Sequence, residues 1–201
     1  KHKGSVTDID FSDAQSNFFV TCSTYGEVMK HTFSGNRLSS TTLVSNPRYD
    51  FRNVFIHQKT NTIYAVSRTG VLVILNGGTQ KVINVNIQKL KSMDVADNQY
   101  IIIGERGMAL FDPEKEIIVA EKQLPFTIET TARYNGYPIL FDRQGRMHQV
   151  KSFDKLETSP VPVKGQVTAF AESKNNKSRY FGMSDGMIYF INGKGQVTQL
   201  V

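Results

Sequence analysis

The chain has 201 residues, of which 39% are hydrophobic and 21% charged, a balance typical of a globular protein rather than a disordered one. No run approaches the ~18 apolar residues of a transmembrane helix, and the start, KHKGSVTDID, lacks the apolar core of a signal peptide, so we expect no membrane insertion. Lys1 stands where an initiator Met would be, which indicates a fragment boundary. The formal net charge of +6 favours acidic partners, such as nucleic acid, an anionic membrane surface or an acidic peptide.

Cys22 is the single cysteine, so an intrachain disulfide and a cysteine-based zinc site are excluded. It lies in the apolar run FFVTCST, which predicts a small buried residue rather than a reactive thiol. The low cysteine content favours a reducing compartment. We therefore expect an intracellular protein of the nucleus or cytoplasm.

Four short strand-like segments recur five times along the chain, and they are rich in β-branched and aromatic residues. The first group reads VTDIDFS, FFVTCS, EVMKHTF and SSTTLV, and the second reads FRNVFIH, TIYAVS, VLVIL and KVINVNI. The third reads KSMDVAD, QYIIIG, MALF and IIVAEKQL, the fourth IETTARY, YPILFD, RMHQV and LETSPV, and the fifth VTAFAES, SRYFGM, MIYFI and QVTQLV. No stretch of about 12 residues has the apolar spacing of a helix, so the sequence predicts an all-β fold.

A glycine precedes the third strand of every group and reveals the period of the repeat. Gly26, Gly70, Gly107, Gly145 and Gly186 are separated by 44, 37, 38 and 41 residues. Glycine adopts positive φ without strain, as a tight hairpin turn requires. A β-sandwich has no such period, whereas a β-propeller of four-stranded antiparallel blades does. We predict a single propeller domain or fragment over residues 1–201, with five blades at approximately 4–44, 45–87, 88–126, 127–162 and 163–201.

The repeat resembles the WD40 family. HKGSVTDIDFS is similar to the head and first strand of such a repeat, and VTAFAES and SDGMIYFIN are similar to its first strand and its Ser-Asp-Gly turn. Phe111-Asp112 stands near the place of the family's Trp-Asp. The chain has no Trp, the turn Asp is found only at Asp185, and the head His only at His2, so we expect the family's His to Ser/Thr to Asp network to be incomplete in most blades.

The resemblance implies a scaffold that holds protein complexes together. It also implies that the blades form a closed ring, for which there are three alternatives. The five blades close by themselves, the chain is part of a larger, seven-bladed propeller, or a partner supplies what is missing. An open ring would expose a strand edge to which another chain could add a strand.

The search for catalytic groups finds few candidates. His2, His31, His57 and His148 lie in different blades without metal-ligand spacing, and no phosphate-binding loop or nucleophile motif occurs. Asp8 and Asp10 share one face of a first strand. They could bind a cation or act in acid-base catalysis, but hydrogen bonds to amides are the favoured interpretation. We expect no catalytic residue, no metal, no cofactor and no small-molecule substrate, and therefore a protein that is not an enzyme.

Basic residues gather in one class of connections. In a blade, the turn between the second and third strands and the connection to the next blade emerge on the same face. In the second, third and fourth blades, Glu105 is the only acidic residue of these turns to oppose the basic ones. Arginine suits phosphate and carboxylate because its planar fork donates two parallel hydrogen bonds. Tyr25 and Tyr49, in nearby loops, could stack on bases or peptide groups. The predicted partner-binding residues are Arg48, Arg52, Arg68, Lys89, Lys91, Arg106, Arg143, Arg146 and Lys164.

These features predict a non-catalytic protein-protein interaction scaffold within a multi-subunit assembly. It would bind acidic peptide segments of its partners through the Arg-rich loop face. The alternative is direct binding of RNA or DNA by the same face. The two differ in salt dependence, because nucleic-acid binding releases counterions and weakens steeply as salt rises.

Overall fold

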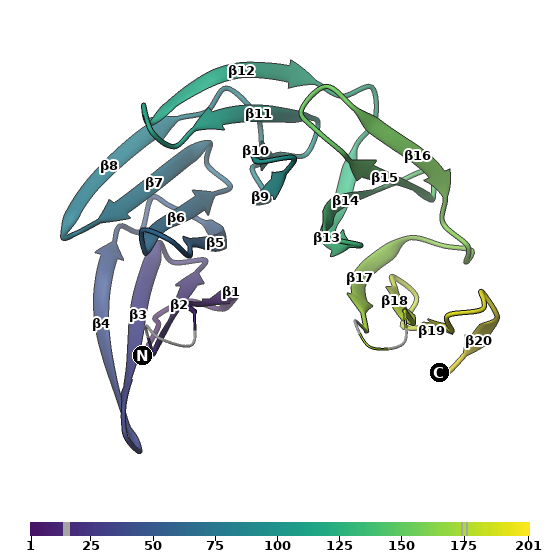
Figure 1. Ribbon diagram of the computed structural model, residues 1–201, viewed down its shortest axis with the longest axis horizontal. Coiled ribbons are helices and arrows are strands. Elements are labelled where there is room, and N and C mark those ends of the chain that lie inside the picture. The colour runs from purple at the N-terminus through teal and green to yellow at the C-terminus, as the bar shows by residue number, and fades with distance from the viewer. Residues whose placement is uncertain (14–16, 174, 176) are drawn as a thin grey trace. The chain divides into compact units, whose positions relative to one another are not determined.

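The computed structural model describes residues 1–13, 17–173, 175 and 177–201, and it contains five four-stranded antiparallel sheets (Figure 1). Each sheet is one predicted blade, with its strands paired in the order in which they occur along the chain. The predicted all-β, β-propeller class is therefore confirmed. Among the described residues, no helix is long and apolar enough to cross a membrane.

The strands agree closely with the predicted segments. The first sheet holds β1 (Val6–Phe11), β2 (Phe18–Ser23), β3 (Glu27–Ser34) and β4 (Arg37–Ser45), and the second holds β5 (Phe51–His57), β6 (Thr62–Ser67), β7 (Val71–Asn76) and β8 (Thr79–Asn84). The third holds β9 (Ser92–Ala96), β10 (Gln99–Ile103), β11 (Gly107–Asp112) and β12 (Ile117–Gln123). The fourth holds β13 (Ile128–Tyr134), β14 (Tyr137–Asp142), β15 (Arg146–Val150) and β16 (Leu156–Pro160), and the fifth holds β17 (Val167–Glu172), β18 (Arg179–Met183), β19 (Ile188–Ile191) and β20 (Val197–Gln199).

The chain divides into two compact units. Unit 1 comprises Lys1–Asp94 and Tyr100–Gln123, and unit 2 comprises Val95–Gln99 and Leu124–Val201. Unit 1 holds the first two sheets and most of the third, and unit 2 holds the fourth and fifth. The assignment of the whole chain to one propeller domain stays a prediction.

The core of unit 1 lies between neighbouring sheets. Alternate side chains of a strand point to opposite faces, so a middle strand covered on both sides is buried along its length, as every residue of β6 is. Cys22 and Val28 of the first sheet pack in one cluster with Phe51 and Val54 of the second. The prediction that Cys22 is buried is confirmed, since its side chain is fully covered.

The core of unit 2 is built around aromatic rings. The centroids of Phe141 and Phe181 are 6.2 Å apart, and Phe170 lies between them at 5.6 Å and 5.1 Å. Such tilted and edge-to-face pairs are favoured over direct stacking by the quadrupole of the ring. Phe141 and Phe181 belong to β14 and β18, so this cluster joins the fourth sheet to the fifth.

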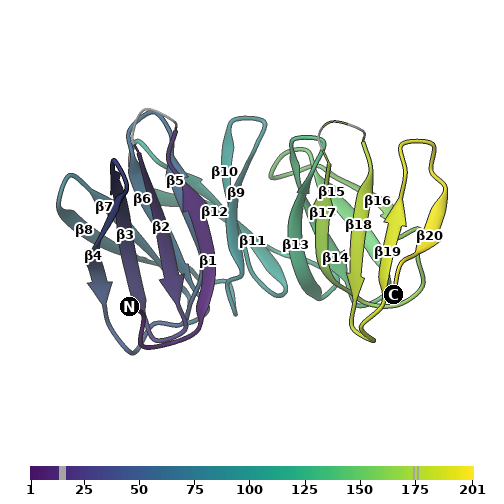
Figure 2. The ribbon, with the colours of Figure 1, turned by 90° about the horizontal axis from the view of Figure 1, so that it is seen from below.

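Backbone hydrogen bonds tie the turns between second and third strands to the connections between sheets. In unit 1, Asn46 N donates to Gly26 O at 3.0 Å, and Arg68 N donates to Asp50 O at 2.7 Å. Figure 2 shows that β2 and β4 run in the same direction and finish at the same end of the first sheet. In unit 2, Arg143 N donates to Thr127 O at 3.3 Å and Ser184 N to Gln166 O at 2.9 Å. Within each unit, these two classes of loop therefore lie together, as the sequence predicts.

Candidate partner-binding site

Basic side chains of unit 1 surround a pocket of about 270 Å³ at this end of the sheets. Arg52 is the second residue of β5, Arg68 lies in the turn between β6 and β7, and Lys89 and Lys91 lie in the connection from β8 to β9. The connection from β8 to β9 is held against the end of β10 and the turn that follows it, because Glu105 N donates to Gln88 O at 3.1 Å and Lys91 N donates to Ile103 O at 2.8 Å. The lining residues are Arg52, Arg68, Lys89, Leu90, Lys91 and Glu105, and we call this the basic pocket.

The two arginines of the basic pocket share one carboxylate. Arg52 Nη2 donates to Asp50 Oδ2 at 2.6 Å, and Arg68 Nη1 lies 4.0 Å from the same oxygen. Asp50 Oδ1 and Arg52 Nε are buried without a hydrogen-bond partner among the described residues. The guanidinium of Arg68 makes no hydrogen bond to the described part of the protein, and about half of its side chain is exposed. Arg68 is thus positioned by charge but keeps its donors for a ligand.

Lys89 reaches the basic pocket from a strained backbone. Its Nζ donates to both carboxylate oxygens of Glu105, at 3.0 Å and 2.9 Å, and half of its side chain is exposed. Its φ is 49°, in the left-handed region that disfavours a residue with a long side chain. Several other non-glycine positions with positive φ hold Asn or Asp, including Asn61, Asn98 and Asn135, because these residues tolerate that conformation. Glu116 and Lys177 share this conformation with Lys89.

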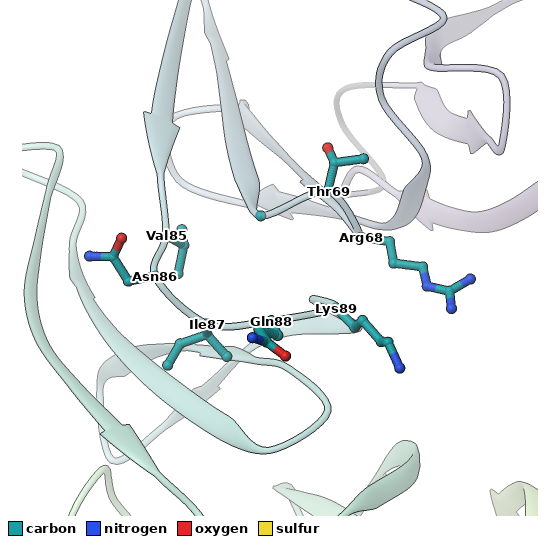
Figure 3. Close-up of a pocket in the computed structure, with 8 residues that line it drawn as sticks. Arg68, Thr69, Val85, Asn86, Ile87, Gln88 and Lys89 are labelled. Carbon is teal, nitrogen blue, oxygen red and sulfur yellow. The ribbon is translucent and has the colours of Figure 1, made fainter.

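A second cavity adjoins the basic pocket and shares Arg68 and Lys89 with it. Its volume is about 450 Å³, and it is lined by residues 68–70 and 85–89. Figure 3 shows the side chains of Arg68 and Lys89 extending in the same direction from these two segments. Asn86 and Gln88 are exposed and carry amide groups that can both donate and accept hydrogen bonds.

The remaining predicted residues lie outside the basic pocket. Arg48 and Arg106 are exposed residues of unit 1, and neither forms an ion pair with a described residue. In unit 2, Arg143 pairs with Glu129, Arg146 pairs with Asp142 at 2.7 Å, and Lys164 is exposed. The structure thus brings four of the nine predicted residues together around one cavity, Arg52, Arg68, Lys89 and Lys91.

Glu105 is the only acidic residue in the turns between the second and third strands of the second, third and fourth sheets, as predicted, but other carboxylates oppose the basic residues. Asp50, Glu129 and Asp142 also pair with them, from the ends of strands and from a connection. The sequence conceals the pairing of Glu129 with Arg143, because Glu129 lies 14 residues earlier on β13, whereas Asp142 ends β14 and pairs with Arg146 across the turn that follows.

The two tyrosines differ in their availability for stacking. Tyr25 is 49% exposed, as a side chain that binds a base or peptide group must be. Tyr49 is partly buried, packs against the core of the first two sheets and meets Phe51 edge-on at 5.5 Å. The expectation that Tyr49 stacks on a ligand is not supported, because its ring already packs against the core.

Asp8 and Asp10 join the first sheet to the second. Asp8 Oδ2 accepts hydrogen bonds from Asn53 Nδ2 at 2.7 Å and Val54 N at 3.0 Å, and Asp10 Oδ2 accepts one from Ile56 N at 2.7 Å. Burial raises the pKa of both carboxyl groups despite these bonds. Asn53 Oδ1 accepts a bond from Met93 N at 2.9 Å and continues the pattern to the third sheet. Both aspartates therefore accept hydrogen bonds from amides, which is the interpretation that the sequence favours.

The sequence gives little sign of a buried polar cluster in the fourth sheet. His148 Nε2 donates to Asp142 Oδ2 at 2.8 Å, and His148 Nδ1 lies 2.8 Å from Thr158 Oγ1. The His148 ring stacks on Phe126 with centroids 3.8 Å apart. Asp142 also accepts hydrogen bonds from Arg146, and these partners hold its pKa below the usual range although burial opposes the shift. The sequence feature that could have predicted this cluster is an Asp at the end of one strand, Asp142, followed after the turn by Arg146 and His148 on alternate positions of the next strand.

A related chain of side chains crosses the first sheet. His2 Nε2 lies 2.6 Å from Thr21 Oγ1, Thr21 Oγ1 lies 2.8 Å from His31 Nε2, and His31 Nδ1 lies 2.8 Å from Ser40 Oγ. His2 Nδ1 is 3.3 Å from Glu27 Oε2 in a charge contact without hydrogen-bond geometry. These residues come from the head of the blade and from its second, third and fourth strands. The histidines thus connect strands.

Comparison with solved structures matches the fold. The WD40 β-propeller domain of Doa1 aligns with 99% of this chain and 69% of its own, with a TM-score of 0.72 and 12% sequence identity. No family model and no curated protein matches the chain. The resemblance to WD40 repeats is therefore confirmed in the fold, and identity this low carries no functional assignment.

Proposed function

We propose that this chain is a non-catalytic protein-interaction domain that binds acidic segments of its partners at the basic pocket. The observation that carries the proposal is the convergence of four cationic side chains on one cavity, with Arg68 and Lys89 half exposed at its rim. Guanidinium and ammonium groups gathered in this way recognise carboxylates and phosphates by charge-assisted hydrogen bonds. Membership of a multi-subunit assembly is part of the same proposal.

The hydrogen bonds made by the titratable side chains support a binding role over a catalytic one. Asp8 and Asp10 accept backbone and side-chain hydrogen bonds from the neighbouring sheet. His148 and Asp142 are buried and bonded to each other. A general acid or base must reach a substrate proton, which the buried pair of His148 and Asp142 does not.

Fluorescence anisotropy with a labelled oligoglutamate peptide tests the proposal. Saturable binding is expected, and the double variant Arg68→Ala/Lys89→Ala should weaken it about tenfold, since two charge-assisted contacts are lost. The matched control is Lys81→Ala/Lys115→Ala, which removes the same charge from an ion pair with Glu116 and from the turn between β11 and β12. Equal weakening by both double variants would reduce the effect to net charge and contradict the proposal.

A single-stranded RNA probe distinguishes the alternative of nucleic-acid binding. If RNA binds more tightly than the peptide, and the logarithm of its affinity falls by about 0.7 per neutralised phosphate for each unit of log salt, the ligand of this face is nucleic acid. Weak RNA binding that does not compete with the peptide supports the protein-binding role. The net charge of +6 is the feature that favours the alternative.

A further inference from the structure

We infer that the basic pocket selects a phosphorylated side chain of a peptide over a carboxylate. This inference rests on the proposed function, which requires only an acidic segment. It is carried by the charge count around the basic pocket, by the hydrogen-bond donors left on Arg68, and by the adjoining cavity, which shares Arg68 and Lys89 with the basic pocket.

The first argument is charge. Four positive residues line the basic pocket, and two carboxylates oppose them, Glu105 in the lining and Asp50 beneath the two arginines. The net charge of this group is therefore +2. A phosphate monoester carries about −1.5 to −2 at neutral pH and nearly neutralises it. A Glu or Asp side chain, or a phosphodiester of nucleic acid, carries one negative charge and would leave an excess positive charge at the site.

The second argument is the supply of donors. Arg68 makes no hydrogen bond to the described residues and keeps its planar fork for a ligand, while Asp50 orients it from 4.0 Å. Lys89 adds an ammonium group held by Glu105. A phosphate monoester offers three terminal oxygens to these donors, and a carboxylate offers two.

The third argument concerns what the phosphate is attached to. The adjoining cavity is lined by residues 68–70 and 85–89, and it is larger than the basic pocket. Val85 and Ile87 line the cavity but are buried in the core, while the exposed amides of Asn86 and Gln88 can bond to a peptide backbone (Figure 3). A free phosphate ion would use only the basic pocket. The combined site therefore fits a phosphorylated residue together with its flanking peptide.

Three labelled peptides of identical Gly-Ser sequence test the inference, with phosphoserine, glutamate or serine at the central position. The phosphoserine peptide is expected to bind at least ten times more tightly than the glutamate peptide, and the serine peptide should not bind. Arg68→Ala should reduce the preference for phosphoserine to about twofold or less, and Lys81→Ala/Lys115→Ala should leave it unchanged. Free phosphoserine should compete only weakly, since it lacks the flanking peptide.

Each other outcome has a defined meaning. Equal binding of the phosphoserine and glutamate peptides would overturn the phosphate preference and leave the proposed function standing. No binding of the acidic peptides, with oligoglutamate also failing, would overturn both. Competition by free phosphoserine as strong as by the whole peptide would overturn the role of the adjoining cavity. Stronger displacement by RNA than by the phosphopeptide would assign the basic pocket to nucleic acid.

Discussion

Single polar residues connect the strands of these sheets. In the fourth sheet, the imidazole of His148 bridges Asp142 on β14 and Thr158 on β16, and its face is covered by Phe126. In the first sheet, His31 bridges Thr21 and Ser40 in a similar way. Because the register places His31 opposite Ser40 and His148 opposite Thr158, each bond crosses directly between paired strands. The histidines therefore stabilise blades in a chain without tryptophan.

Replacing His148 tests this role. We expect His148→Ala to lower the free energy of unfolding by about 2–4 kcal/mol, because it leaves the buried carboxylate of Asp142 short of a hydrogen bond and removes the stacking on Phe126. His57→Ala is the matched control. Among the described residues, the His57 side chain bonds to Thr60 in its own turn and contacts the Tyr100 ring at 5.8 Å, so its loss should cost less than about 1 kcal/mol. Urea denaturation followed by circular dichroism measures both. Similar losses for the two variants would contradict the assigned role.

The lowered pKa of Asp142 predicts that the free energy of unfolding depends on pH in the acidic range. Its pKa is lowered in the folded protein, so ionised Asp142 contributes stability above the unfolded value near 3.8, and this contribution is lost as pH falls through the folded pKa. The difference in unfolding free energy between the wild type and Asp142→Asn should therefore be constant above about pH 5 and shrink below pH 3.8. A difference that grows in acid would show that the pKa is raised instead.

The thiol of Cys22 should be inert in the folded protein. Its side chain is fully buried, Thr7 Oγ1 lies 3.2 Å from the sulfur, and burial raises its pKa to about 12. The thiolate is the reactive form, so modification by a disulfide reagent should be slow under native conditions and fast in denaturant. Absorbance of the released thiol follows the reaction. Rapid modification of native protein would mean that the first sheet opens or that Cys22 is exposed.

At the scale of the element, the hairpin glycines serve different needs. Gly26, between β2 and β3, has φ 72°, and an added Cβ would lie 1.7 Å from Asn46 O in the connection to the second sheet. Gly35, between β3 and β4, has φ 58°, and nothing lies within 4 Å of the corresponding position. Gly26 is needed both for its positive φ and for the close approach of the Asn46 carbonyl, whereas Gly35 is needed for its positive φ alone.

Alanine substitution separates these two needs within one sheet. Both Gly26→Ala and Gly35→Ala should cost about 1–2 kcal/mol from left-handed backbone strain. Gly26→Ala should cost at least about 2 kcal/mol more, because the clash involves the backbone carbonyl of Asn46, which accepts a hydrogen bond from Tyr49 N within the connection. Thermal and urea unfolding of the two variants supply the comparison. Equal costs would mean that the connection at Asn46 shifts freely.

At the scale of the whole molecule, the two units differ in how many of their basic side chains are available to bind a ligand. Six of the nine predicted binding residues belong to unit 1, and three belong to unit 2. In unit 2, Arg143 and Arg146 pair with Glu129 and Asp142, and Asp142 is fully buried. In unit 1, Arg68 and Lys89 lie at the rim of a cavity. We therefore expect the affinity for acidic ligands to arise from unit 1.

Two double variants of equal charge test this expectation. Arg143→Ala/Lys164→Ala in unit 2 should change the affinity for the oligoglutamate peptide by less than about twofold, whereas Arg68→Ala/Lys89→Ala in unit 1 should weaken it about tenfold. Anisotropy titrations at one ionic strength compare them directly. Equal weakening by the two variants would spread the binding site over both units and contradict its placement at the basic pocket.

The repeat could be read from the sequence because its physical causes are local. Alternation of side chains, β-branched and aromatic composition and a glycine at each tight turn are properties of neighbouring residues, and they predicted all twenty strands and the burial of Cys22. The candidate face also followed from this reading, since turns and connections of the repeat emerge at one end of each sheet.

The basic pocket was decided only by the tertiary structure. Whether an arginine is available depends on carboxylates brought to it by other segments, as Glu129 of β13 is brought to Arg143 in the turn after β14. The grouping of Arg52, Arg68 and Lys89 around one cavity likewise requires three segments to fold against each other. Local pattern determines strands and turns, whereas side-chain charge acts through space, and its partners appear only when distant residues meet.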